Sequence, residues 1–290
     1  MLKPLIVITG RNGQLGSELA QLTHAHASNF DFLFTGRNEL DLAKPAGIPS
    51  FFEKYTPSFF INCAAFTAVD KAETEQEDAY TINAEAVGIL AQQCHANHCT
   101  LISISTDYVF DGKGSEPYQT NQTPDPVNYY GYTKWLGEKL ALVNNDRTII
   151  IRTSWLYSEY GNNFVKTMLG LMKEKTALKV VNDQLGSPTY AADLADAILK
   201  IIVSLETGNR HYGIYQYSNI GVISWYDFAT TIRNIAVLPC EILPIPGSVY
   251  VTPAKRPAYS VMDTTAIVKD FGIELKEWKK SLKTCLGKLL

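Results

Sequence analysis

The stretch LIVITGRNGQLGSEL, residues 5–19, decides the fold. It combines an apolar strand, a loop with Gly10, Gly13 and Gly16 in GxxGxxG spacing, and the start of an amphipathic helix. In such a loop the first glycine permits a tight turn, the second lets a pyrophosphate approach the backbone, and the third lets the helix pack closely. The helix N-terminus then faces the phosphates. The stretch therefore predicts a dinucleotide-binding site in preference to an ordinary turn between strand and helix.

Strand-like and helix-like segments alternate through the first half of the chain. Further apolar runs predict strands at residues 30–36, 58–65, 100–105 and 147–155. Helical patterns lie between them, at residues 47–55 and 84–97. Continuous apolar strands separated by helices indicate an α/β fold, a Rossmann-type doubly wound parallel sheet covered on both faces.

The pattern changes after about residue 155, where two helical segments alternate with polar stretches, among them VVNDQLGSPTY with its proline, residues 180–190, and YQYSNIGVISW, residues 215–225. We predict a dinucleotide-binding Rossmann domain over residues 1–152. Residues 153–290 are expected to form mainly a smaller substrate-binding lobe. The boundary is soft, and the chain is expected to cross back to the Rossmann domain.

Composition and charge limit the classes of binding partner that the sequence predicts. The 290 residues carry a net charge of −3 without a basic block, which gives no electrostatic reason to expect nucleic acid or an acidic membrane surface. The longest apolar runs are far shorter than a membrane span, and the N-terminus lacks the pattern of a signal peptide. We expect a cytoplasmic protein with a small-molecule substrate.

Five cysteines occur with irregular spacing and without a CxxC pair, which favours free thiols in a reducing compartment. The segment CHANHC, Cys94 to Cys99, has residue types that hold zinc, but no second ligand cluster completes a site. It is interpreted as a helix end that runs into a strand, and no metal is expected.

The end of the second strand bears on cofactor choice. NAD-preferring sites usually have an acidic residue there, whereas this chain has TGRN, residues 35–38, and no acid before Glu39. Arg37 is suited to pair with a 2′-phosphate, which favours NADPH over NADH. A solvated loop arginine is the alternative, so NADH stays open. Asp41 and Leu42 are expected along the adenine.

Two polar motifs stand further along the chain. Tyr130 and Lys134 have YxxxK spacing and would share one helix face. A lysine beside a phenol favours the phenolate, lowering a pKa that starts near ~10. STDYVFDG, residues 105–112, follows a predicted strand, so its side chains are either the polar end of that strand or substrate contacts. Taken alone, each motif is also typical of an ordinary protein surface.

Together, the glycine loop, a threonine after a later strand and YxxxK resemble the extended short-chain dehydrogenase/reductase family. The resemblance implies that Tyr130 is the acid/base, that Lys134 holds the nicotinamide ribose and that Thr106 binds the reacting oxygen. It also implies the cofactor-binding set Gly10, Asn12, Gly13, Gln14, Leu15, Gly16, Arg37, Asp41, Leu42, Cys63, Ala64, Ala65, Thr67, Tyr130 and Lys134.

Longer blocks are similar to the dTDP-4-dehydrorhamnose reductase family, among them NCAAFTAVDKAE, NYYGYTKWLGE, IRTSWLY, DQLGSPTYAADLA and RPAYSVMDT. This resemblance implies reduction of the C4 ketone of dTDP-4-dehydro-6-deoxy-L-mannose to dTDP-L-rhamnose with NADPH or NADH, for polysaccharide biosynthesis, by a monomer or homodimer. It implies a substrate-binding set of Asp107, Val109, Trp155, Gln184 and Arg256, with Ser260 in the same lobe and Asn62 under the cofactor.

The sequence departs from that family at several positions. Thr120 and Gln122 replace acids that are usual in the loop before the tyrosine. Some relatives form a magnesium-bridged dimer through glutamates; Glu18 matches one, but Ala192 and Lys288 replace others, so no such dimer is expected.

Three alternatives remain open: another nucleotide-sugar reductase or epimerase, a dehydratase, and a non-catalytic NADP-binding subunit that resembles the regulatory partner of methionine adenosyltransferase. A dehydratase would have Asp-Glu after the threonine, whereas this chain has Asp107 and Tyr108.

Overall fold

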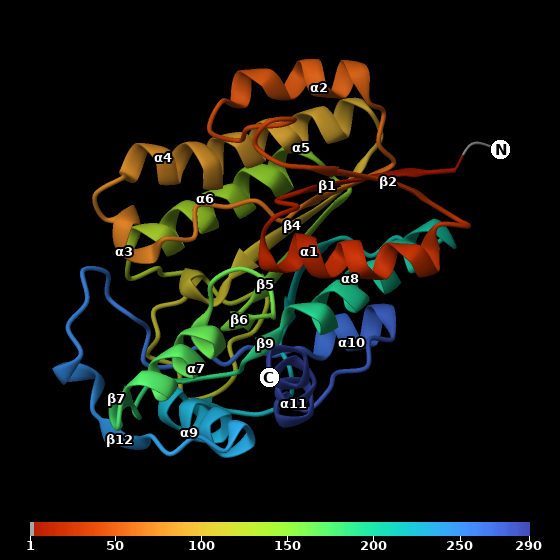
Figure 1. Cartoon of the computed structure of the whole chain (residues 1–290). Coiled ribbons are helices and arrows are strands. Elements are labelled where there is room, and N and C mark those ends of the chain that lie inside the picture. Colours follow the sequence, from red (N-terminus) through yellow and green to blue (C-terminus); the bar gives the residue numbers. More distant parts are fainter. Residues whose placement is uncertain (1–2) are drawn as a thin grey trace.

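Six parallel strands form the central sheet of the computed structural model, which describes residues 3–290 (Figure 1). Their order across the sheet is β10–β5–β4–β3–β1–β2. The strands are β1 (Leu5–Thr9), β2 (Asp31–Thr35), β3 (Phe59–Asn62), β4 (Thr100–Thr106), β5 (Thr148–Thr153) and β10 (Gly213–Tyr217). In this register Val7 of β1 pairs with Leu33 of β2 and Phe60 of β3.

Helices cover both faces of the sheet, because successive side chains of a buried strand point to opposite faces. Ile6 and Ile8 pack with α1 (Gln14–Leu22) and α8 (Ala191–Glu206). Val7, between them, packs on the other face with α2 (Ile48–Lys54) and α5 (Ala86–Ala96), and α6 (Tyr129–Asn144) lies against α5. The predicted Rossmann-type α/β fold is confirmed.

The sheet has a topological switch point next to β1. The strand that follows β1 in sequence, β2, lies on one side of it, and β3 lies on the other. The connections that leave the C-terminal ends of β1 and β3 therefore diverge to opposite faces and open a crevice between them. Ligands of doubly wound sheets bind in this crevice.

The sixth strand of the sheet differs from the sequence-based prediction. Residues 215–225 are predicted to be a polar stretch of the lobe, but residues 213–217 form β10, the edge strand beside β5. Tyr215 and Tyr217 belong to the main core, together with α8 and α10 (Thr265–Phe271). Gln216 between them is fully buried, although its residue type indicated a surface position. These residues form a strand because they pack against helices that are distant in sequence, although the local sequence is polar.

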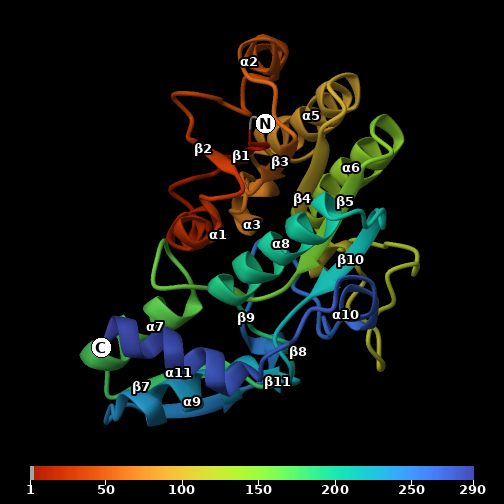
Figure 2. The ribbon, with the colours of Figure 1, turned by 90° about the vertical axis from the view of Figure 1, so that its right-hand side faces the viewer.

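The second lobe packs below the C-terminal ends of the strands (Figure 2). Its core holds Tyr157, Val165, Phe228 and Leu282. The main elements are α7 (Phe164–Glu174), β7 (Ala177–Val181), α9 (Trp225–Ala236), β12 (Glu241–Ile245) and α11 (Trp278–Leu289). Because α8, β10 and α10 pack with the sheet, the lobe is built from separate stretches of chain.

Short elements complete the chain. They are α3 (Val69–Ala72), α4 (Gln76–Tyr80), a π turn (Thr81–Glu85), 3₁₀ turns (Thr23–His26, Pro45–Gly47, Asp107–Val109, Gly247–Val249) and the strands β6 (Leu156–Tyr157), β8 (Leu185–Gly186), β9 (Thr189–Tyr190) and β11 (Ile223–Ser224). Among residues 3–290, no helix is both long and apolar enough to cross a bilayer.

Candidate active site

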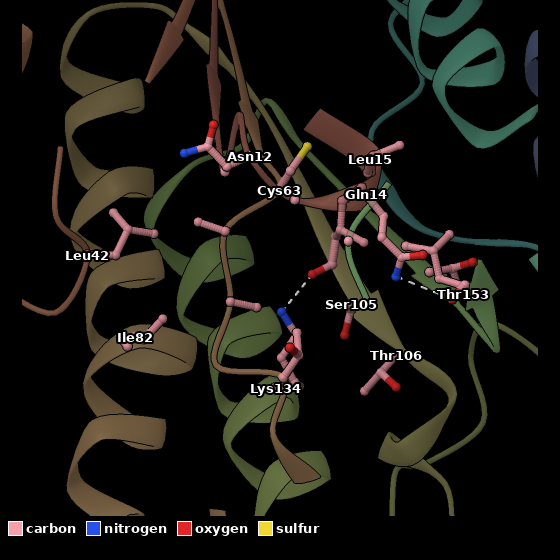
Figure 3. Close-up of a pocket in the computed structure, with 18 of the residues that line it drawn as sticks. Asn12, Gln14, Leu15, Leu42, Cys63, Ile82, Ser105, Thr106, Lys134 and Thr153 are labelled. Atoms are coloured by element: carbon pink, nitrogen blue, oxygen red, sulfur yellow. Dashed lines mark hydrogen bonds between the residues drawn. The ribbon is translucent and has the colours of Figure 1, made fainter. Parts of the chain in front are cut away.

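A cavity of about 810 Å³ lies at the switch point (Figure 3). It is lined by the glycine loop after β1, the turn after β2, the segment after β3, the end of β4, the start of α6 and lobe residues that include Trp155 and Trp225. Segments far apart in sequence thus meet at the C-terminal edge of the sheet, as the fold predicts.

The glycine loop is shaped by close backbone contacts. Gly10 has a φ of 71°, a conformation that favours glycine, and a Cβ there would lie 3.0 Å from the backbone of Cys63. A Cβ at Gly16 would lie 2.3 Å from the Gly10 carbonyl oxygen, so only glycine fits between α1 and the loop. These contacts leave the loop backbone bare at the cavity and fit the approach of a dinucleotide's phosphates.

Nearly all of the predicted cofactor set lines this cavity. The exception is Gly16, which supports the loop from below instead of facing the cavity. The others that line it are Gly10, Asn12, Gly13, Gln14, Leu15, Arg37, Asp41, Leu42, Cys63, Ala64, Ala65, Thr67, Tyr130 and Lys134. Asn62 lies just below, with its side-chain Oδ1 accepting a 2.7 Å hydrogen bond from Thr9.

An acidic residue stands at the end of β2 after all. The turn after β2 places the Glu39 carboxylate on the Gly36 backbone N–H at 2.8 Å, and Arg11 of the glycine loop pairs with it at 3.2 Å. The Gly36 hydrogen bond, with Arg11, holds the pKa of Glu39 below its usual range. Glu39 is the first acid after the strand in the sequence, but its distance of four residues from β2 did not predict that its carboxylate returns to the strand end. The short turn Gly36–Asn38 was the available signal.

The three predicted catalytic side chains converge at the end of β4. Thr106 ends β4, Tyr130 and Lys134 stand on α6, and all three line the cavity. Lys134 donates from Nζ to the Ile104 carbonyl at 2.7 Å, and Figure 3 shows this bond across from Thr106. Burial lowers the pKa of Lys134 to about 8, and the Glu138 carboxylate acts in the opposite direction.

Burial sets the pKa of Tyr130 in this structure. It raises that pKa to about 12, with the Thr106 hydroxyl acting against this shift and the Asp107 carboxylate adding to it. The Lys134 ammonium is bound to the Ile104 carbonyl. The lowering of the phenol pKa by Lys134 stays a prediction, and with a pKa of about 12 the phenol is protonated at neutral pH.

Asp107 is a buried carboxylate with one oxygen that lacks a hydrogen-bond partner among the described residues. Its side chain is 3% exposed, and its Oδ1 accepts a 3.0 Å hydrogen bond from Thr106. Its Oδ2 has no partner within residues 3–290. Burial raises the pKa of Asp107 to about 6, although the neighbouring Thr106 and Ser260 hydroxyls oppose the shift. An unpartnered buried oxygen at a cavity wall points to a ligand that supplies the missing donor.

Trp155 forms an aromatic wall of the cavity. It has a φ of 48°, which is strained for a bulky side chain, and it stacks on Trp225 with ring centroids 3.5 Å apart and planes 11° apart. A Cβ at Gly186 would lie 2.6 Å from the Trp155 ring, so the ring is packed from that side as well. Sequence reading did not find Trp225, which follows a serine helix cap and carries no motif of its own.

Two predicted substrate residues, Gln184 and Arg256, line a second cavity of about 470 Å³ in the lobe. Arg256 is already engaged there. Its two Nη atoms donate to the two carboxylate oxygens of Asp70, each at 2.9 Å. Lys255 also lines this cavity, is exposed, and forms no ion pair among the described residues.

Val109 lines neither cavity, and its contact with substrate stays a prediction. It is fully buried in a small core with Phe110, Tyr118 and Met262. The 3₁₀ turn at Asp107–Val109 reverses the chain after β4, so Asp107 faces the cavity while Val109 points into the protein.

The comparisons with known proteins agree with this geometry. Residues 4–290 match the family described as RmlD substrate binding domain. The chain is 40% identical over 285 residues to the dTDP-4-dehydrorhamnose reductase of Aggregatibacter actinomycetemcomitans, across 96% of this chain and 97% of that protein. The chain belongs to the dTDP-4-dehydrorhamnose reductase family. The resemblance drawn from the sequence blocks is thus confirmed.

Two further members of this reductase family, or close relatives of it, are similar over nearly their whole length. The spore coat polysaccharide biosynthesis protein SpsK of Bacillus subtilis is 39% identical, across 97% of this chain and 96% of that protein. The dTDP-4-dehydrorhamnose reductase of Bacillus anthracis, solved in complex with NADP, is 36% identical with a TM-score of 0.93, across 99% and 100% of the chains.

The positions where this member of the reductase family departs from the expected pattern have local partners. The Thr120 carbonyl accepts a 3.3 Å hydrogen bond from Arg152. Glu18 accepts a 2.7 Å hydrogen bond from Ser158, and Lys288 pairs with Glu159 next to it. Within residues 3–290, no group of three or more His, Cys, Asp or Glu side chains is arranged to hold a metal ion.

Proposed function

We propose that this protein reduces the C4 ketone of dTDP-4-dehydro-6-deoxy-L-mannose to dTDP-L-rhamnose with NADPH or NADH, NADPH being favoured. The observation that carries the proposal is the convergence of Thr106, Tyr130 and Lys134 beside a glycine-loop cavity in a chain of the dTDP-4-dehydrorhamnose reductase family. The relative from Bacillus anthracis was solved with NADP, which supports the cofactor.

The glycine loop would hold the cofactor phosphates, with Arg37, Asp41 and Leu42 toward the adenosine. Cys63, Ala64 and Ala65 would line the path toward the nicotinamide, and Lys134 would hold its ribose. A bound reduced nicotinamide supplies the hydride, which is the cofactor's own chemistry.

The protein's own residues manage the proton. Tyr130, whose pKa is raised to about 12, keeps its proton at neutral pH and would donate it to the C4 oxygen as the ketone becomes an alcohol. Thr106 would hydrogen-bond the same oxygen and hold it between hydroxyl and phenol. Orientation of the ketone against these groups would account for much of the acceleration.

The sugar would lie against Asp107 and the Trp155 wall. Asp107 Oδ2, which has no partner within the described chain, would accept a hydrogen bond from a sugar hydroxyl. The diphosphate would extend toward the second cavity, where Gln184 and Lys255 face it. Because Arg256 is bound by Asp70 on both nitrogens, its contribution to anion binding would be mainly its charge.

Five free cysteines support a cytoplasmic location, because a reducing compartment keeps thiols unpaired. The protein would act as a monomer or homodimer, and its product would enter polysaccharide biosynthesis. Tyr108 stands where a dehydratase would have a second carboxylate, which favours simple reduction over elimination.

The deciding experiment follows the loss of nicotinamide absorbance with purified protein, enzymatically prepared dTDP-4-dehydro-6-deoxy-L-mannose, and NADPH or NADH. We expect absorbance loss that matches dTDP-rhamnose formation. Tyr130→Phe should lose most of the turnover, while Tyr132→Phe, an exposed tyrosine on the same helix, should keep it. Tight NADPH binding without turnover would favour the regulatory-subunit alternative, and cofactor recycling without net oxidation would favour an epimerase.

A further inference from the structure

The helix that carries Tyr130 begins at a side chain with two partners. Asn128, the N-cap of α6, is 7% exposed. Its Oδ1 accepts the Gly131 backbone N–H at 2.8 Å, which caps the helix. Its Nδ2 donates to the carbonyl of Lys255 at 2.9 Å, 127 residues away in the lobe.

The lobe segment bound by Asn128 is held from the Rossmann side a second time. Asp70 accepts the Ala254 backbone N–H at 3.1 Å and pairs with Arg256 through both carboxylate oxygens. Residues 254–256 are thus clasped between Asp70 of α3 and Asn128 of α6. The same segment lines the second cavity through Lys255 and Arg256.

The first turn of α6 has little freedom to move independently of the catalytic strand end. A Cβ at Gly131 would lie 2.1 Å from the Tyr108 carbonyl oxygen, so the turn packs directly on the segment that follows Thr106. The rings of Tyr108 and Tyr130 meet edge to face with centroids 5.7 Å apart. The position of the Tyr130 phenol therefore depends on how this turn is seated, and Asn128 fixes the start of the turn.

We propose that Asn128 is a positioning residue that couples the lobe segment 254–256 to the placement of Tyr130. One amide oxygen fixes the start of the catalytic helix, and the nitrogen of the same amide fixes the edge of the lobe cavity. For a substrate that spans both cavities, Asn128 would thus fix the position of the Tyr130 phenol relative to the lobe cavity that holds the other end of the substrate. This inference rests on the proposed reductase function for its kinetic consequence, but not for the clasp itself.

Two substitutions separate capping from coupling. Asn128→Asp and Asn128→Ser keep an oxygen that caps Gly131, because Asp and Ser are good N-caps. The aspartate at pH 8 has no N–H for the Lys255 carbonyl, and the serine side chain is too short to reach it. Asn145→Asp is the matched control: this buried asparagine at the other end of α6 donates to the Cys99 and Arg147 carbonyls.

Kinetics at pH 8 with saturating NADPH give the first test. Because the Lys255 carbonyl loses its donor and the lobe segment loses one of its anchors, we expect both Asn128 variants to lose roughly 10-fold in kcat/KM for the dTDP-sugar. Their NADPH Kd should stay within about 2-fold and their Tm within about 3 °C of wild type. Asn145→Asp should lower Tm while keeping kcat/KM. Wild-type kcat/KM in the Asn128 variants, or an equal loss in Asn145→Asp, overturns the inference.

Hydrogen exchange on the intact protein tests the clasp without any turnover. Both Asn128 variants should exchange faster than wild type at residues 254–258, while residues 131–134 stay protected by the retained cap. Unchanged exchange at 254–258 contradicts the clasp. A wild-type protein that does not reduce the dTDP-sugar overturns the proposed function instead, and the exchange comparison still decides whether Asn128 holds the lobe.

Discussion

Glu138 and Arg152 form a buried ion pair between the helix that carries Lys134 and strand β5 of the sheet. Arg152 donates through Nη2 to Glu138 Oε2 at 2.6 Å and through Nε to Oε1 at 2.9 Å, and the two side chains are 1% and 3% exposed. Ser105, which precedes Thr106 on β4, donates to the same carboxylate. One ion pair thus connects α6, β4 and β5 beneath the candidate active site.

Breaking that pair should cost stability. Glu138→Gln leaves the Arg152 guanidinium buried without a counter-charge, and we expect the free energy of unfolding to fall by about 3–5 kcal/mol. Urea denaturation measures it. Because an apolar pair avoids the stranded charge, Glu138→Met combined with Arg152→Met should lose less than Glu138→Gln alone. A loss below about 1 kcal/mol in the single variant would show that the charge is solvated or compensated elsewhere.

Lys134 should give activity and stability opposite dependences on pH. Burial lowers its pKa to about 8 from 10.5, so the charged amine that is proposed to hold the ribose is lost above pH 8. We expect kcat/KM to fall as pH rises through about 8. Between pH 8 and 10.5 the unfolded chain binds more protons at this site, so the contribution of Lys134 to unfolding free energy rises with pH.

Lys134→Met is the control for this prediction. The variant should be nearly inactive, and its unfolding free energy should lack the increment between pH 8 and 10.5 that the wild type shows. The comparison of the two stability profiles isolates the lysine from other groups that titrate in the same range. A kcat/KM that stays level to pH 10 would contradict the depressed lysine pKa.

The buried charge of Asp107 should lower the free energy of unfolding while it supports turnover of the dTDP-sugar. Burial raises its pKa to about 6 from 3.8, so the folded state holds its proton more tightly and this group's contribution to stability falls as pH rises between those values. Asp107→Asn removes the buried charge. We expect unfolding free energy at pH 7 to rise on the order of 1–3 kcal/mol while kcat/KM for the dTDP-sugar falls. A variant that is both less stable and fully active would reject this account.

The Arg11–Glu39 pair should set the preference between cofactors. A 2′-phosphate would compete with Glu39 for Arg11, whereas a ribose hydroxyl would find an acceptor in Glu39. We expect Arg11→Ala to weaken NADPH binding roughly 10-fold with little change for NADH, by fluorescence titration. Glu39→Gln should tighten NADPH and weaken NADH. Arg37→Ala tests the other arginine that lines this end of the cavity, and equal effects of Arg11→Ala on both Kd values would exclude a role of Arg11 in selection.

Local sequence determined the parts of this protein that local physics controls. The glycine loop, the five strands predicted in the first half and the pairing of Tyr130 with Lys134 on one helix all follow from spacing within a few residues. Parallel strands bring their C-terminal ends to one edge, so Thr106 and Gly10 were predictable neighbours once the strands were located. The sequence also predicted that Gly16 lets α1 pack closely against the loop, and a Cβ at this position would lie 2.3 Å from the Gly10 carbonyl oxygen.

Tertiary structure decided the features that depend on contacts between distant segments. Residues 213–217 form a strand because α8 and α10 bury them, although the polar Gln216 interrupts the apolar run that would predict a buried strand. Arg256 is committed to Asp70, which lies 186 residues away in sequence, and no local motif announces that pairing. Asn128 caps α6, and its second partner, the Lys255 carbonyl, is supplied by the folded lobe. Burial and charge pairing depend on which surfaces meet, and spacing along the chain does not encode that.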